Sequence, residues 1–265
     1  MATRTARWRT KSDERMSLGA HLVELRKRLT IAAAAIAITA IGGFIASDYV
    51  IAALQAPIMQ VAETTGRDAN LNFDMVTGAF DIKLQIALTI AVVAASPIWL
   101  YQIWAFLVPG LVRKEKQYAL GFLGAAVPLF LLGCFAGYMV MPHIVELMLG
   151  FAPAETISNL GAKYYYDFIL KLLLATGIAF VLPVFLVLLN FVGVLSGKAL
   201  LKGWRVAILA ICLFTAIATP AADVISMFLL AIPMVVLYFA AVLIAFVHDR
   251  QVAKRNAEIE ASLID

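Results

Sequence analysis

Residues 172–197 read LLLATGIAFVLPVFLVLLNFVGVLSG and contain no Asp, Glu, Lys or Arg. A helix needs about 20 apolar residues to cross the ~30 Å hydrocarbon core of a bilayer, so this stretch is long enough to span a membrane. In lipid, a spanning segment must satisfy its own backbone hydrogen bonds, which favours a helix. The whole chain suits such a setting, because 63% of its 265 residues are hydrophobic and only 14% are charged. The stretch therefore predicts a transmembrane helix in an integral membrane protein.

Five further apolar runs flank this one, so the predicted fold is all-α, a polytopic membrane protein with six transmembrane helices. The predicted spans cover about residues 29–47, 84–108, 118–141, 170–194, 205–218 and 225–247. Residues 17–250 form the predicted membrane domain, preceded by a disordered basic tail (1–16) and followed by a cytoplasmic C-terminal tail (251–265). The fifth span is stopped by Thr219-Pro220 and reaches only ~20 Å at 1.5 Å per residue.

The distribution of basic residues predicts the orientation of the spans. Of the 21 Lys and Arg residues, seventeen precede the first span, follow the sixth, or lie in the second-to-third and fourth-to-fifth connections. The other side holds at most four, namely Arg67, Lys83, Lys163 and Lys171. Because cytoplasmic loops of membrane proteins are enriched in Lys and Arg, both termini are predicted to be cytoplasmic.

The sequence carries no P-loop, zinc-ligand pair or nucleophile elbow. His21, His143 and His248 are far apart in the sequence, and Cys134 and Cys212 lie inside apolar runs, so neither residue type predicts a metal site. We therefore expect no catalytic residue, no metal, no cofactor and no nucleic-acid partner. Two function classes stay open, a small-solute secondary transporter and a receptor or scaffold. Few ionisable residues lie deep in the spans, which disfavours an ion-coupled carrier.

Two stretches at the predicted inner surface carry a pattern. Residues 17–29, SLGAHLVELRKRL, predict a short amphipathic helix whose face opposite the leucines holds His21, Glu24 and Arg28. Taken alone, Glu24 would pair with Arg28 at i,i+4, a surface contact of ~0.3–0.5 kcal/mol. Residues 96–116, SPIWLYQIWAFLVPGLVRKEK, close the second span with aromatic side chains. Glu115 is the only acid in the basic loop that follows and, taken alone, would balance its neighbours.

Together these stretches resemble the TatC family, the multi-spanning core of the twin-arginine protein translocase. The matching segments include His-Leu-x-Glu-Leu-Arg-x-Arg-Leu from His21, Tyr-Gln-x-Trp-Ala-Phe from Tyr101 and Phe-x-x-Pro from Phe180, all in the right order. The resemblance runs from about residue 17 to 250. Five prolines in matching positions are expected to be structural: Pro57, Pro109, Pro183, Pro220 and Pro233.

The resemblance implies a receptor that binds the twin-arginine signal peptides of folded export cargo in the inner membrane of a prokaryote. It also implies single-span TatA- and TatB-like partners, membrane lipid, a homo-oligomer in the complex, and transport driven by the proton-motive force. By motif, Glu24 and Glu115 would accept the two arginines and Phe106 would support that site. The chemistry is suitable, since Arg–carboxylate pairs can be bidentate and charge-assisted.

The hairpin of the fifth and sixth spans is expected to thin the bilayer and to dock partner helices through hydrogen bonds from Thr219 and Ser226. Asp223, with no base nearby in the sequence, is expected to sit in water at the outer surface.

One position departs from the family pattern. Many TatC-like chains have a polar or acidic residue after the Phe of Phe-x-x-Pro, facing a concave membrane groove, and this chain has Val181. Either the groove is drier here, or another polar residue such as Thr176 or Asn190 serves.

Overall fold

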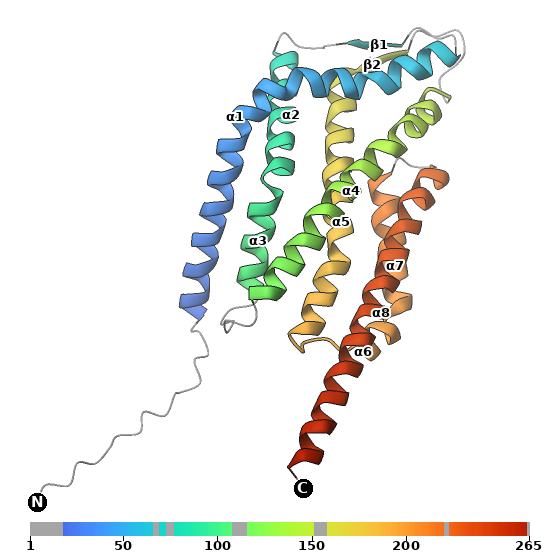
Figure 1. Cartoon of the computed structure of the whole chain (residues 1–265). Coiled ribbons are helices and arrows are strands. Elements are labelled where there is room, and N and C mark those ends of the chain that lie inside the picture. The colour runs from blue at the N-terminus through green and yellow to red at the C-terminus, as the bar shows by residue number, and fades with distance from the viewer. Residues whose placement is uncertain are drawn as a thin grey trace, which may run out of the picture.

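The computed structural model describes residues 18–65, 69–72, 77–107, 116–150, 158–219 and 223–263, which form a bundle of helices with two short strands at one end (Figure 1). The helices are α1 (Leu18–Thr65), α2 (Gly78–Ala94), α3 (Ser96–Leu107), α4 (Lys116–Gly150), α5 (Ala162–Phe191), α6 (Gly197–Lys202), α7 (Trp204–Ala218) and α8 (Val224–Ser262). The strands are β1 (Ala69–Asn72) and β2 (Ser158–Gly161).

Seven helices account for the six predicted spans. α1, α4, α5 and α8 are each long and apolar enough to cross a membrane. α2 and α3 form a fifth span that is bent by 58°, and the shorter apolar helix α7 is the sixth. The prediction of an all-α protein with six transmembrane helices is confirmed, and the two short strands are an addition to it. α7 has 15 residues and so measures only ~22 Å along its axis.

The bend between α2 and α3 has a chemical cause. Pro97 lacks a backbone N–H and its ring clashes with the preceding turn, which interrupts the helical hydrogen bonds. The indole of Trp99 compensates, because its Nε1 donates to the carbonyl oxygen of Val92 at 2.9 Å. Beyond the bend, α3 continues beside the start of α1 (Figure 1).

α4 and α5 pack closely because two glycines of α4 face α5. A Cβ added at Gly133 would lie 2.6 Å from the carbonyl oxygen of Thr176, and one added at Gly137 would lie 2.6 Å from the Thr176 hydroxyl. On the facing helix, Gly177 leaves space that the Cys134 and Phe130 side chains occupy. Glycines four residues apart are the small-residue pattern that lets transmembrane helices approach closely.

We call the end that carries β1 and β2 the strand end. There β1 and β2 form a parallel ladder that pairs Ala69 with Ser158 and Asn72 with Gly161. α1 bends and lies across this end of the bundle (Figure 1). The ladder joins two segments far apart in the sequence, because backbone hydrogen bonds hold the connection after α1 to the connection after α4.

Acidic side chains at the strand end pair with the bases of the same end. The Lys83 ammonium lies 2.9 Å from the Asp48 carboxylate and joins α2 to α1. Lys171 donates to Asp167 at 2.9 Å, and the Asp167 carboxylate also accepts from Nε2 of Gln85 in α2. The hydrogen bond from Lys171 is the main reason why the pKa of Asp167 is lowered. These bases are therefore largely neutralised by their neighbours.

The opposite end, which we call the basic end, holds the start of α1 and the end of α8 (Figure 1). α6 and the start of α7 also lie there, and with them Lys198, Lys202 and Arg205. α8 is 39 residues long and continues well past the other helices at this end.

Asp223 is buried, so the expectation that it sits in water is wrong. The residue is only 2% exposed, and its Oδ1 accepts a hydrogen bond from the backbone N–H of Ser226 at 2.9 Å. Asp is a favoured residue before the first turn of a helix, since its carboxylate binds free N–H groups and complements the helix dipole. Asp223 therefore caps the start of α8.

Candidate functional site

The start of α1 and the end of α3 meet at the basic end, and two aromatic rings make the contact. The His21 ring stacks on the Phe106 ring with 4.4 Å between centroids and 25° between planes. The two segments that carry the sequence patterns are thereby brought together. The contact of Phe106 is with His21, which lies three residues before Glu24 on α1, so the support of Glu24 by Phe106 stays a prediction.

Glu24 forms an ion pair with Arg28 one turn further along α1. Its Oε1 accepts from Nη2 of Arg28 at 2.5 Å and from Nε at 3.1 Å. The same guanidinium donates through Nη1 to Oε1 of Gln102 in α3, at 3.3 Å. The Glu24 side chain is 26% exposed, and within the described residues its Oε2 has no hydrogen-bond partner. Among the described residues, Glu24 is thus paired with Arg28 through one carboxylate oxygen only.

An apolar pocket of about 310 Å³ lies between α1 and α3 next to this ion pair. Aliphatic side chains such as Leu29 and Ile36 form most of its lining. The polar and aromatic lining residues are Arg28, Gln102, Trp99 and Phe106. The site therefore combines a partly exposed acid with a space for apolar groups.

Some predicted residues fall outside the part of the chain that the structure describes. Glu115, Pro109 and Pro220 are among them, so the pairing of Glu115 with an arginine stays a prediction. Pro57 lies in α1, and Pro183 and Pro233 lie inside α5 and α8.

A family model described as "Sec-independent protein translocase protein (TatC)" matches residues 20–233. The chain belongs to the TatC family. The resemblance drawn from the two stretches of sequence is thereby confirmed. A chain with six apolar spans in this family is a multi-pass protein of the bacterial inner membrane.

TatC relatives match along almost the whole chain. A Sec-independent protein translocase protein TatC from Xylanimonas cellulosilytica is 42% identical, covering 94% of this chain and 90% of the relative. One from Rothia mucilaginosa is 38% identical, covering 95% and 88%. A crystal structure of the twin arginine translocase receptor TatC in DDM superposes with a TM-score of 0.73 at 32% identity, covering 85% of this chain and 99% of that one.

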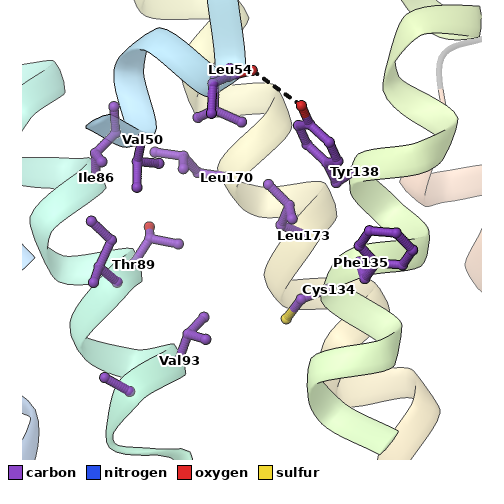
Figure 2. Close-up of a pocket in the computed structure, with 13 residues that line it drawn as sticks. Val50, Leu54, Ile86, Thr89, Val93, Cys134, Phe135, Tyr138, Leu170 and Leu173 are labelled. Carbon is purple, nitrogen blue, oxygen red and sulfur yellow. Dashed lines mark hydrogen bonds between the residues drawn. The ribbon is translucent and has the colours of Figure 1, made fainter. Parts of the chain in front are cut away.

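A second pocket of about 470 Å³ lies between α1, α2, α4 and α5 (Figure 2). In Figure 2, side chains of α2 such as Thr89 and Val93 face those of α4, while Leu170 and Leu173 of α5 lie between them. The Tyr138 hydroxyl donates to the backbone carbonyl oxygen of Ala53 at 3.3 Å. None of the described residues that line this pocket is charged.

The Val181 position does not open onto either pocket. Val181 is 2% exposed and packs in a core cluster with Leu100 and Phe130. Thr176 is also buried, and its hydroxyl donates to the carbonyl oxygen of Leu172 in its own helix. Of the two alternatives for this TatC-family position, the geometry favours a drier interior over a substitute polar residue.

Asn190, the other substitute considered, has a different role at the basic end. Its Nδ2 donates to the Asp249 carboxylate at 2.8 Å and to the carbonyl oxygen of Leu195 at the same distance. Asp249 also accepts from the backbone N–H of Gly197 at 2.7 Å, which is the main reason why its pKa is lowered. The His248 ring lies 3.1 Å from Oδ1 of Asn190. These hydrogen bonds attach the segment that connects α5 with α6 to helix α8.

The two hydroxyls expected to dock partner helices are buried. Thr219 is 6% exposed and donates to the carbonyl oxygen of Thr215 at 2.9 Å. Ser226 is 0% exposed, and its hydroxyl has no partner among the described residues. Neither hydroxyl is at the surface in this arrangement. Docking on the hairpin stays a prediction, and it would have to use the apolar faces of α7 and α8.

Two features, one in the site and one in the helix packing behind it, were not predicted from the sequence. Gln102 was part of the Tyr-Gln-x-Trp pattern, but nothing in the pattern showed that it would reach Arg28. Gly133 and Gly137 were spaced as Gly-xxx-Gly inside an apolar run, and that spacing is a signal that could have been used.

Proposed function

We propose that this chain is the receptor subunit of a twin-arginine protein translocase, with Glu24 as part of its signal-peptide site. One observation carries the assignment of the site: a partly exposed acid, whose Oε2 has no hydrogen-bond partner in the part of the chain that the structure describes, lies beside an apolar pocket at the basic end. The solved TatC relative supports the function, since it is described as a twin arginine translocase receptor.

An incoming guanidinium would share Glu24 with Arg28. A carboxylate has about four lone-pair sites, and Arg28 uses only Oε1. Oε2, which none of the described residues contacts by a hydrogen bond, can accept a charge-assisted hydrogen bond from an arginine of the signal peptide. Glu115 would be the acceptor of the second arginine, and apolar residues beside the arginines would enter the pocket between α1 and α3.

Binding of a labelled peptide to the purified full-length protein tests this function. We expect saturable binding of a twin-arginine signal peptide. A matched Lys-Lys peptide should bind about tenfold or more weakly, because an ammonium group cannot make the planar two-point contact and each lost charge-assisted hydrogen bond costs ~1.5–3 kcal/mol. A solute carrier has no reason to bind either peptide. Equal binding of the two peptides, or none, would contradict the receptor assignment.

The basic end is proposed to face the cytoplasm, where an unexported signal peptide arrives. Arg26 and Lys27 at the start of α1 and Arg250 at the end of α8 are exposed there. At the strand end, Lys83 and Lys171 are instead paired with acids. Exposed Lys and Arg are retained on the cytoplasmic side of a membrane.

Reporter fusions along the chain check this orientation. Fusions at Arg113, Lys198 and Val252 are expected to read cytoplasmic, and fusions at Asp68 and Asn159 external, because of the seventeen-to-four distribution of basic residues. A phosphatase active only outside the cytoplasm and a fluorescent protein that matures only inside give opposite readouts at each site. An external signal at Lys198 would refute the six-span topology.

Membership of the TatC family places the chain in a translocase complex with other Tat components. We propose that these include TatA- and TatB-like single-span proteins, and that the complex draws on the proton-motive force. α7 offers an apolar strip for such a helix, formed by Val206, Leu209, Leu213 and Ile217, each more than 60% exposed. Because α7 is ~22 Å long against a hydrocarbon core of ~30 Å, the bilayer beside this strip is expected to be thinned.

A further inference from the structure

The last part of α8 projects from the basic end past the other described helices (Figure 1). Asp249 makes the final side-chain contacts to the bundle, with Asn190 and Gly197. Every residue from Arg250 to Leu263 is exposed. A single helix of this length is only marginally stable in water. Packing against a partner would therefore add most to the stability of a helix that lies outside the bundle.

The projecting segment carries a heptad pattern. Val252, Asn256, Ile259 and Leu263 follow one another at spacings of four, three and four residues, which are the d and a positions of a coiled coil. The three apolar members of this seam are 44%, 52% and 80% exposed. A single Asn at an a position is the residue that fixes register and a two-stranded parallel state in such assemblies. No described residue therefore covers this seam, and its composition is that of a pairing surface.

The charges beside the seam match a parallel copy of the same helix. Arg255 occupies the g position and Glu260 the e position of the next heptad, the two positions that meet across a parallel pair. In the described residues, neither side chain has an ion pair within the chain. Lys254 and Glu258, on the outward side of the helix, instead face each other at 4.0 Å.

We infer that the end of α8 pairs with the same segment of a second copy of this chain as a short parallel coiled coil. Two copies inserted in one membrane have the same orientation, so their α8 ends point the same way and only parallel pairing is available. The seam spans about two heptads and would be weak between free peptides. Anchoring both helices in the bilayer raises their effective concentration, as a short linker does. This surface is separate from the signal-peptide site on α1 and α3.

Disulfide crosslinking of the full-length protein in its membrane tests the pairing. Ile259→Cys places a thiol in the seam, and Ala261→Cys places one two residues further on the outward side. With a hydrophilic oxidant, the Ile259→Cys chain is expected to form a disulfide dimer several-fold more than the Ala261→Cys chain. The parent chain gives the background from Cys134 and Cys212, which lie in membrane spans. Equal yields at both positions would show random collision and would overturn the proposal, as would crosslinking of Ile259→Cys to another protein only.

A charge exchange gives an independent test in the same Ile259→Cys chain. Arg255→Glu sets two acids against each other across the pair and should lower the dimer yield several-fold. Adding Glu260→Arg recreates opposite charges in swapped positions and should restore the yield. If the double variant stays as low as the single one, the parallel pairing of Arg255 with Glu260 is wrong.

Discussion

Replacing Gly133 with leucine is expected to prevent the close packing of α4 on α5 and to destabilise the protein by about 3 kcal/mol or more. An added Cβ would lie 2.6 Å from the carbonyl oxygen of Thr176 and 2.9 Å from the Cα of Gly177. These are backbone atoms of a buried helix, so no side-chain rotation relieves the overlap and the two helices must separate. Heating the detergent-solubilised protein with a fluorescent tag and measuring the monodisperse fraction by size exclusion reports the loss.

Gly124→Leu is the matched control for this variant. Gly124 lies on the same helix, is exposed, and has no atom within 4 Å of an added Cβ. The same change of residue type there should alter the stability by no more than ~0.5 kcal/mol. A comparable loss at both glycines would mean that the effect comes from helix propensity or insertion, and not from the contact with α5.

The neighbouring glycine allows the contact to be dissected further. At Gly137, the nearest atom to an added Cβ is the Thr176 hydroxyl oxygen at 2.6 Å, and the next is the Cα of Leu173 at 3.4 Å. Thr176→Ala should therefore relieve Gly137→Ala, so that the double variant loses less than the sum of the single ones. The same Thr176→Ala should not relieve Gly133→Ala, because there the overlap is with the backbone.

Glu24→Gln is expected to weaken the binding of a twin-arginine signal peptide by one to two decades while leaving expression and insertion intact. The amide keeps the size of the side chain but loses the charge, and each charge-assisted hydrogen bond lost costs ~1.5–3 kcal/mol. Glu115→Gln should have a similar effect, since it would be the acceptor of the second arginine. Fluorescence anisotropy of a labelled peptide on the purified variants measures the change.

A rival explanation is that Glu24 and Glu115 only neutralise the positive charge of nearby bases. Under that explanation, Glu24 interacts with Arg28 and not with the signal peptide. The double variant Glu24→Gln with Arg28→Gln separates the two explanations. If Glu24 only neutralises Arg28, removing both charges should restore parental binding; if Glu24 accepts the signal arginine, binding should stay weak. Glu258→Gln is the control, since Glu258 also pairs with a base four residues away near the basic end.

The spans could be predicted because a bilayer imposes one strong constraint on the chain. A run of about 20 residues without charge has few alternatives to a helix, so the runs predicted the six spans. Contacts between distant segments could not be predicted in the same way. The burial of Asp223 and the close approach of Gly133 to Thr176 depend on which helices become neighbours, and the runs do not contain that information.

In the candidate site too, local spacing could be predicted from the sequence and contacts between distant segments could not. Helical spacing placed His21, Glu24 and Arg28 on one face of the first helix, and the structure confirms the i,i+4 pair within it. The contact from Arg28 to Gln102 joins residues 74 positions apart, and the 58° bend at the start of α3 sets the direction of the helix that carries Gln102. The prediction that Phe106 and the start of α1 belong to one site came from the family resemblance and not from residue spacing.

The parallel ladder at the strand end sets an order of events during synthesis. Parallel strands cannot be joined by a tight turn, and here three helices separate β1 from β2. Asn72 is made about 90 residues before its partner Gly161, a delay of roughly 5–18 s at ~5–20 residues per second. A nascent chain therefore has its first helices in the membrane for seconds while the edge of β1 lacks its strand partner. Arrival of residues 158–161 closes that edge, so a chain released early would expose to membrane proteases an edge that the finished protein covers.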